Sequence, residues 1–205
     1  KCQIFVEQHY KKEEELRWLA YHDINTGIEN YAYLTDKFHT ALEQAKVSQT
    51  QIAVLSIAPD SLGQLNAVSD QGLSAKIAAG IAERIRSNLS ENDFLAQTSG
   101  HHFTVLVTGL EFTLGVEKKI DAILRSFSRP IFIDDLEFDL TVSIGVCFCP
   151  QDGEDLQELI SHADLALRQV RSDEKSSMRV YSTDLSLKAA VSMNMRRNLK
   201  NAIEN

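Results

Sequence analysis

The spacing of apolar residues along the chain predicts alternating helices and strands. Apolar side chains that recur every three or four residues predict four helices, at residues 31–47, 75–89, 116–127 and 156–170. Short apolar runs bounded by polar or turn residues predict six strands, at residues 52–57, 94–97, 103–107, 131–133, 138–146 and 178–181. Because hairpins interrupt the alternation, the pattern predicts an α/β (α+β) domain with a mixed or mostly antiparallel sheet.

Residues 1–19 precede this pattern and favour a separate helix. The segment from Lys11 to Ala20 is charged, and Glu13 stands four residues before Arg17, the favourable order for a helical ion pair. We interpret residues 1–19 as a connecting helix from an upstream sensor or membrane region; a solvated helix without a signalling role explains them equally well. The chain has no initiator methionine, no signal-peptide pattern and no run of about 18 apolar residues. We therefore expect a fragment of a longer protein.

Charge and cysteine content narrow the classes of function. A net charge of −8 and a pI near 5.2 argue against nucleic acid as a partner, because nucleic-acid-binding proteins are usually basic on the face they use. Three cysteines form no even disulfide framework, which suits a reducing cytoplasm. Cys147 and Cys149 stand two apart in a predicted strand, so both thiols should point to one face, as core residues.

Two stretches of the sequence are more specific than their periodicity. The first holds Ala20-Tyr21-His22-Asp23, Thr26-Gly27-Ile28 and Asn30, and the second holds Leu140 to Val146, Asp152-Gly153 and Ala163 to Leu167. They resemble the opening and the closing of the GGDEF domains of bacterial diguanylate cyclases, although Asn25 and Tyr31 replace the usual Leu and Arg. The likeness covers residues 20–181. It implies a central mixed five-stranded sheet wrapped by helices, related to the palm of nucleotide cyclases and polymerases.

The resemblance also implies that catalytic groups are missing. Enzymes of this family join two GTP molecules, one per protomer of a head-to-head pair, with the help of magnesium, which prefers carboxylate ligands. Their metal-binding Asp-x-Asp aligns with Ala58-Pro59-Asp60, and their Gly-Gly-Asp/Glu-Glu-Phe signature aligns with Ser99-Gly100-His101-His102-Phe103. A methyl group and two imidazoles, which are poor magnesium ligands, replace the carboxylates. We expect no cyclase activity, no bound magnesium or other cofactor, and no metal at His101 and His102.

The nucleotide-recognition positions are only partly retained. The family's phosphate-contacting Lys and guanine-reading Asp align with Gly63 and Ala75. The vestigial nucleotide-binding set that remains is Asp60, Asn66, Gly100, Arg171 and Lys175. We favour structural alternatives for the polar and basic members, with Asn66 as a helix or turn cap and the two basic residues as a solvated helix end.

The family's inhibitory site for cyclic di-GMP is also incomplete. Its Arg-x-x-Asp motif aligns with residues 90–93, where Ser90 stands at the arginine position and only Asp93 remains. Without the guanidinium that would bind guanine and phosphate, we expect no cyclic di-GMP at this site.

Residues 182–205 suggest what followed the domain. The stretch from Arg196 to Ile203 is helically spaced and is similar to the linker that introduces an EAL phosphodiesterase domain in tandem proteins of this family. We interpret residues 182–205 as a linker helix toward an EAL domain that this chain does not contain. The hypothesis is a catalytically inactive regulatory domain in cyclic di-GMP signalling, which couples an upstream sensor to a downstream EAL phosphodiesterase or receptor domain of the same chain.

Two other hypotheses stay open at this point. The domain is an allosteric GTP-binding module of an active cyclic di-GMP phosphodiesterase, or it is a protein-interaction scaffold without a ligand. A homodimer and weak GTP binding are further candidate interactions. We expect a cytoplasmic domain, in a full-length protein that is anchored to the inner membrane.

Overall fold

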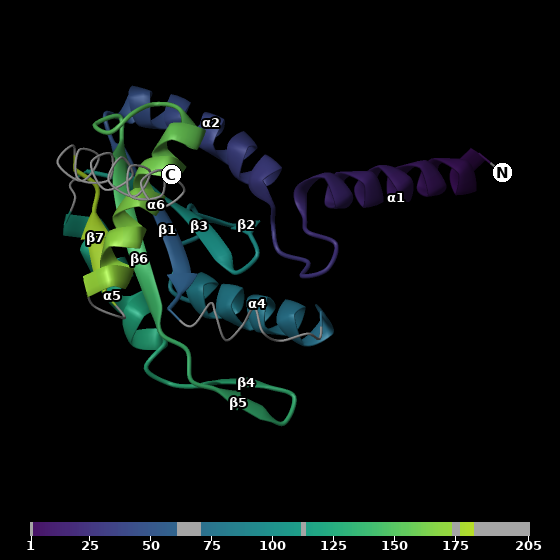
Figure 1. Cartoon of the computed structure of the whole chain (residues 1–205). Helices are drawn as coiled ribbons and strands as arrows, with labels where there is room; N and C mark the ends of the chain where they lie inside the picture. Colours follow the sequence, from purple (N-terminus) through teal and green to yellow (C-terminus); the bar gives the residue numbers. More distant parts are fainter. Residues whose placement is uncertain (1, 61–70, 112–113, 174–176, 183–205) are drawn as a thin grey trace, which may run out of the picture.

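The computed structural model describes residues 2–60, 71–111, 114–173 and 177–182 (Figure 1). Helices and strands follow one another in the order that the apolar spacing predicts. The elements are α1 (Cys2–Tyr21), α2 (Tyr31–Ser48), β1 (Gln51–Pro59), α4 (Gln71–Arg86), β2 (Phe94–Ser99), β3 (His102–Leu110), α5 (Leu114–Ser126), β4 (Ile131–Ile133), β5 (Leu136–Phe138), β6 (Val142–Cys149), α6 (Leu156–Asp173) and β7 (Met178–Val180).

A five-stranded sheet in the order β2-β3-β1-β6-β7 forms the centre of the domain (Figure 1). Strand β1 pairs antiparallel with both β3 and β6, and β2 pairs antiparallel with β3. The edge strand β7 pairs with β6 in parallel. The predicted mixed sheet of an α+β fold is therefore confirmed.

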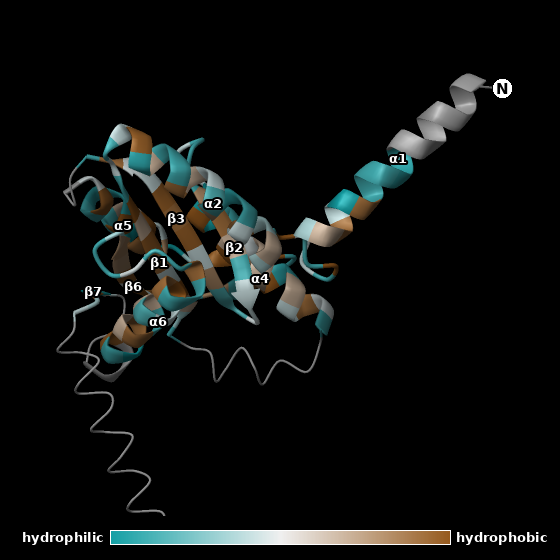
Figure 2. Cartoon of the chain, turned by 90° about the horizontal axis from the view of Figure 1, so that it is seen from above, coloured by the Kyte–Doolittle hydropathy of each residue, from teal (hydrophilic) through white to brown (hydrophobic). Residues whose placement is uncertain are grey.

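Both faces of the sheet are covered, which explains why its central strands read as continuous apolar runs. On one face, buried side chains of α4 and α5 pack against alternate residues of β1, among them Leu55 and Ile57. On the other face, α2 and α6 pack against Ile52 and Val54. Figure 2 shows the hydrophobic strands β1 and β3 lying between more hydrophilic helices.

The two strand cysteines lie on the second face, as predicted. Cys147 and Cys149 are both buried in the cluster under α2 and α6, and the Cys147 thiol donates to the Leu159 carbonyl oxygen at 3.0 Å. Burial raises the pKa of Cys149 to about 11, and it raises the pKa of Cys147 as well. These thiols are core groups rather than reactive ones.

Two predicted elements were wrong in their bounds. The strand predicted over 138–146 is two strands, because β5 leaves the central sheet and pairs with β4 through Ile131 and Phe138, and β6 begins only at Val142. The helix predicted over 75–89 is α4, which begins at Gln71 and ends at Arg86. Leu89 packs against the core from the turn beyond the helix, so it keeps the apolar spacing without being helical.

Helix α1 projects away from the domain (Figure 1). The helix expected within residues 1–19 is observed and ends at Tyr21. Near its end, Leu16, Trp18 and Leu19 remain exposed. No helix in the described part of the chain is both long enough and apolar enough to cross a membrane.

Candidate nucleotide site

The hairpin between β2 and β3 has a tight turn that glycine permits. Ser99 pairs with His102 across the turn, and Gly100 between them has φ +50°, a left-handed conformation that other residues adopt at a cost. A side chain at Gly100 would meet no atom within 4 Å, so the backbone angle, not the available space, explains the glycine.

The two histidines of this hairpin lie in different environments. His101 is 6% exposed, and its Nε2 lies 3.4 Å from the Ser74 hydroxyl oxygen, a long contact. Burial lowers the pKa of His101, so its imidazole is neutral at neutral pH. His102 begins β3 and is only partly buried.

The end of β1 carries little metal-binding chemistry. Ala58 is fully buried and pairs with Ser143 of β6. The Ser143 hydroxyl donates to Asp60 Oδ1 at 2.5 Å, and the Asp60 amide donates to the Thr141 carbonyl oxygen. The neighbouring Ser56 hydroxyl donates to the carboxylate of Asp164. The carboxylates of Asp60 and Asp164 therefore each accept a hydrogen bond from a serine of the sheet.

The side chains at this edge do not fit a magnesium ion. Magnesium needs several hard oxygen ligands in octahedral geometry. A methyl group stands at Ala58, and an imidazole stands at His101.

A cavity of about 340 Å³ opens beside the hairpin. Three segments line it: the turn after α1, the start of α4 and the hairpin. The lining side chains are uncharged apart from one carboxylate, and among the described residues none is a lysine or an arginine. The lining residues are Asp23, Asn25, Thr26, Gln71, Ser74, Ala75, Ala78, Gln97, Gly100 and His101.

The cavity coincides with part of the nucleotide site that the family resemblance implies. Ala75, at the position of the guanine-reading Asp, lines it together with Gly100 and His101. The wall formed by Asp23, Thr26 and Gln97 was not predicted from the sequence. The His22-Asp23 and Thr26-Gly27 motifs were the available signal, but they did not indicate that the turn faces the hairpin.

The turn after α1 is fixed by its own polar groups. Asp23 Oδ1 accepts hydrogen bonds from the amides of Asn25 and Thr26, at 3.0 and 2.9 Å. The Asp23 amide donates to the Ile28 carbonyl oxygen, and the Gly27 amide donates to the Asp23 carbonyl oxygen, both at 2.8 Å. Asn30 caps α2 by accepting from the Tyr33 amide at 3.1 Å.

Asp93, the remnant of the inhibitory motif, is an internal structural group. Its side chain is 1% exposed and forms an ion pair with Lys119 of α5. It also accepts hydrogen bonds from the amides of Ser90 and Thr108, at 2.8 and 3.3 Å. These contacts occupy the carboxylate and join the loop before β2 to β3 and α5.

The other predicted site residues lie at or beyond the limits of the described structure. Asn66, Gly63 and Lys175 lie outside the described residues. Arg171 lies on the last turns of α6, and its side chain is outside the described part.

The sheet order, the helices on both faces and the hairpin beside a cavity define an α+β domain of the nucleotide-cyclase-like class. Residues 20–177 match the family described as diguanylate cyclase, GGDEF domain, and the chain belongs to this family. A GGDEF-domain structure of TpbB (YfiN) from Pseudomonas aeruginosa superimposes with a TM-score of 0.75 at 26% identity, over 82% of this chain and 99% of that one.

Two curated relatives from Pseudomonas aeruginosa belong to cyclic di-GMP signalling. Cyclic di-GMP phosphodiesterase NbdA is 28% identical over 190 residues, which are 92% of this chain and 24% of the relative. Bifunctional diguanylate cyclase/cyclic di-GMP phosphodiesterase MucR is 26% identical over 190 residues, which are 93% of this chain and 28% of the relative. The chain thus spans about a quarter of each of these relatives.

Proposed function

We propose that this GGDEF domain is a non-catalytic regulatory domain in cyclic di-GMP signalling. In this proposal it transmits a signal from a segment upstream of α1 to an EAL phosphodiesterase or receptor domain downstream, in a protein anchored to the inner membrane. The observation that supports the proposal lies at the end of β1 and in the adjoining hairpin. Ala58 and His101 stand there at positions that hold carboxylates in the family. Phosphoryl transfer between two GTP molecules depends on metal ions that neutralise charge, so loss of their ligands removes the main source of catalysis.

The similarity to NbdA supports the downstream part of the proposal. That relative is named as a cyclic di-GMP phosphodiesterase and is about four times as long as the segment it shares with this chain. The fold supports the rest, because the core, the hairpin backbone and the turn after α1 are all intact although the carboxylates are absent. A domain that acts through contacts with other domains, rather than through catalysis, needs an intact fold but not an intact active site.

A second candidate function is allosteric GTP binding, and the cavity beside the hairpin favours it. Its volume of about 340 Å³ accommodates a nucleobase, and Ser74, Gln71 and Gln97 offer hydrogen bonds. Against this candidate, the described lining has no cation to meet phosphates, and Ala75 lacks the carboxylate that reads guanine.

Calorimetric titration of the 205-residue chain with GTP, with and without magnesium, separates the two functions. The regulatory proposal predicts that magnesium changes nothing and that no heat of binding is measured at millimolar GTP. Micromolar binding that is independent of magnesium and lost in Asn66→Ala would support the GTP sensor instead. Magnesium-dependent binding would contradict the loss of the metal site, and with it the proposed function.

A further inference from the structure

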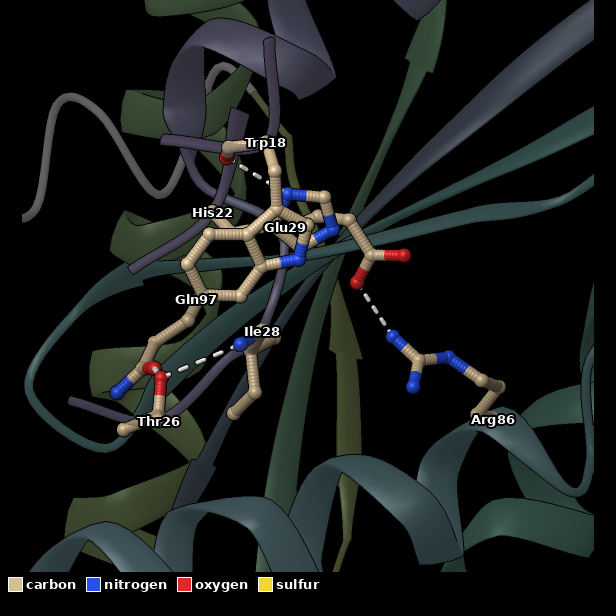
Figure 3. Close-up of polar contacts among 7 residues, drawn as sticks. All are labelled: Trp18, His22, Thr26, Ile28, Glu29, Arg86 and Gln97. Carbon is tan, nitrogen blue, oxygen red and sulfur yellow. Dashed lines mark hydrogen bonds and ion pairs between the residues drawn. The ribbon is translucent and has the colours of Figure 1, made fainter. Parts of the chain in front are cut away.

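The turn after α1 contacts the hairpin through one pair of side chains. The Thr26 hydroxyl lies 2.7 Å from Gln97 Oε1, although the two residues are 71 positions apart in sequence. On the other side of the same amide, Gln97 Nε2 donates to the carbonyl oxygen of Gly100 in the hairpin turn. Figure 3 shows Gln97 reaching from β2 toward Thr26.

These two contacts fix the orientation of the Gln97 amide. Only the NH₂ group can donate to the Gly100 carbonyl, so the amide oxygen faces Thr26. The Thr26 hydroxyl lies 2.7 Å from Gln97 Oε1 and 3.1 Å from Asp23 Oδ1, and its single proton serves these two acceptors. Flipping the amide would place its oxygen against the Gly100 carbonyl oxygen and break that hydrogen bond. Gln97 is therefore bonded at the same time to the turn and to the hairpin.

A backbone contact and an ion pair reinforce this connection. The backbone amide of Gln97 donates to the Glu29 carbonyl oxygen at 2.8 Å. The Glu29 carboxylate forms an ion pair with Arg86 at the end of α4 (Figure 3). The turn is thus bonded to β2 and to α4, the elements that form the other two walls of the cavity.

The other end of the turn is joined to α1. The His22 ring stacks on Trp18, with centroids 4.9 Å apart and planes 8° apart, and the His22 amide and Nδ1 both lie within hydrogen-bond distance of the Trp18 carbonyl oxygen (Figure 3). Asn30 also donates from its side chain to the Ala20 carbonyl oxygen at 3.0 Å. A continuous set of bonded groups runs from the end of α1 to the hairpin.

We propose that Gln97, through Thr26 and Gly100, couples the orientation of α1 to the conformation of the β2–β3 hairpin. A change in α1 that moves the turn breaks the Thr26 contact, which frees the amide that holds the Gly100 carbonyl. Conversely, a change at the hairpin or in the cavity reaches α1 by the same groups, because coupling between two sites is reciprocal. The inference rests on the proposed regulatory function and names residues that would carry it.

Gln97→Leu in the 205-residue chain tests the coupling, because leucine keeps the volume and removes both amide bonds. The readouts are hydrogen exchange of the Asp23 and Gly27 amides, which lie in the turn, and the emission of Trp18, the only tryptophan of the chain. We expect exchange at these two amides to become about fivefold faster, the loss that one ordinary hydrogen bond gives. We also expect the Trp18 emission to shift.

Thr26→Val and a double variant make the test specific. Thr26→Val should accelerate exchange of the amides at 99–103 in the hairpin. At these amides the double variant should exchange no faster than Gln97→Leu alone, because both changes act on one connection. Thr40→Val is the matched control, since the Thr40 hydroxyl bonds only to its own helix, at Asp36. It should leave both regions unchanged.

Unchanged Asp23, Gly27 and Trp18 signals in a folded Gln97→Leu variant would overturn the coupling, as would strictly additive effects in the double variant. Global unfolding would accelerate the buried amides of β1 as well, so these amides show whether the variant is folded. Failure of the coupling leaves the proposed function standing, because that function is tested by GTP and magnesium titration rather than by exchange.

Discussion

Gly145 and Gly100 both lie in stretches that resemble the family's motifs, but different physical constraints favour glycine at the two positions. Gly145 lies in β6, where an added Cβ would be 2.0 Å from the Ala163 carbonyl oxygen and 2.4 Å from the Leu167 amide of α6. Gly100 lies in the hairpin, where an added Cβ would meet nothing within 4 Å, and only φ +50° favours glycine. The first is required by packing, and the second by the turn.

The surroundings of the two glycines follow the same division. Every residue of β6 is buried, and the neighbouring stretches are the ones that resemble the family most closely. Next to Gly100, His101 and His102 stand where the resemblance implies the signature carboxylates, and Ser99 pairs with His102 across the turn. The proposed function accounts for this division, because a non-catalytic domain needs the residues that hold its fold but not those that bind metal.

Gly145→Ala should give the largest effect on stability. Because the new methyl group would overlap backbone atoms of α6, β6 and α6 must separate, and we expect a loss of about 3 kcal/mol or more in the free energy of unfolding. Urea denaturation measures it. Gly115→Ala is the control, since its Cβ would meet only a flexible side-chain atom of Leu110, at 3.3 Å, and should change stability by less than about 1 kcal/mol. A tolerated Gly145→Ala would contradict the packing comparison.

Gly100→Ala should give a smaller effect, because it meets a backbone penalty without a clash. The cost of a left-handed residue predicts a loss of about 1 kcal/mol. Gly100→Asn should recover part of this loss, since asparagine tolerates this conformation better than alanine. Thermal unfolding of the two variants measures the difference. A loss for Gly100→Ala as large as that for Gly145→Ala would mean that the hairpin is packed as tightly as the core.

His101→Gln should give the smallest effect, and only in acid. Burial lowers the pKa of His101 below its ordinary value of 6.5, so just below pH 6.5 the unfolded chain binds more protons than the folded chain. The free energy of unfolding therefore falls as the pH drops through this window. His101→Gln removes the titrating imidazole, so its free energy of unfolding should fall less between pH 7 and 5.

Urea titrations at several pH values measure the effect of His101. His39→Gln, which changes an exposed residue of α2, is the control and should keep the slope of the parent chain. An unchanged slope in His101→Gln would show that the His101 imidazole is not held neutral by the fold.

The fold could be predicted from the sequence because apolar spacing reports burial. The spacing predicts the helices and strands but not which strands pair. It therefore predicts one strand over residues 138–146, although Phe138 pairs with Ile131 of another strand. The hairpin could be predicted from the two strand-like runs on either side of residues 98–102, and the resemblance gave the positions of its two histidines in the family's signature. The contact between Thr26 and Gln97 could not, because a hydrogen bond across 71 residues leaves no period in the sequence. Asp93 likewise gave no sign of its partner Lys119.

The most direct test of the central claim is the formation of cyclic di-GMP from GTP by the 205-residue chain, with magnesium or manganese and with an active diguanylate cyclase measured alongside. Because the proposed function places Ala58 and the two histidines at the family's metal-binding carboxylate positions, we predict no product above that of a reaction without protein. Product that accumulates with time and with protein concentration would contradict it.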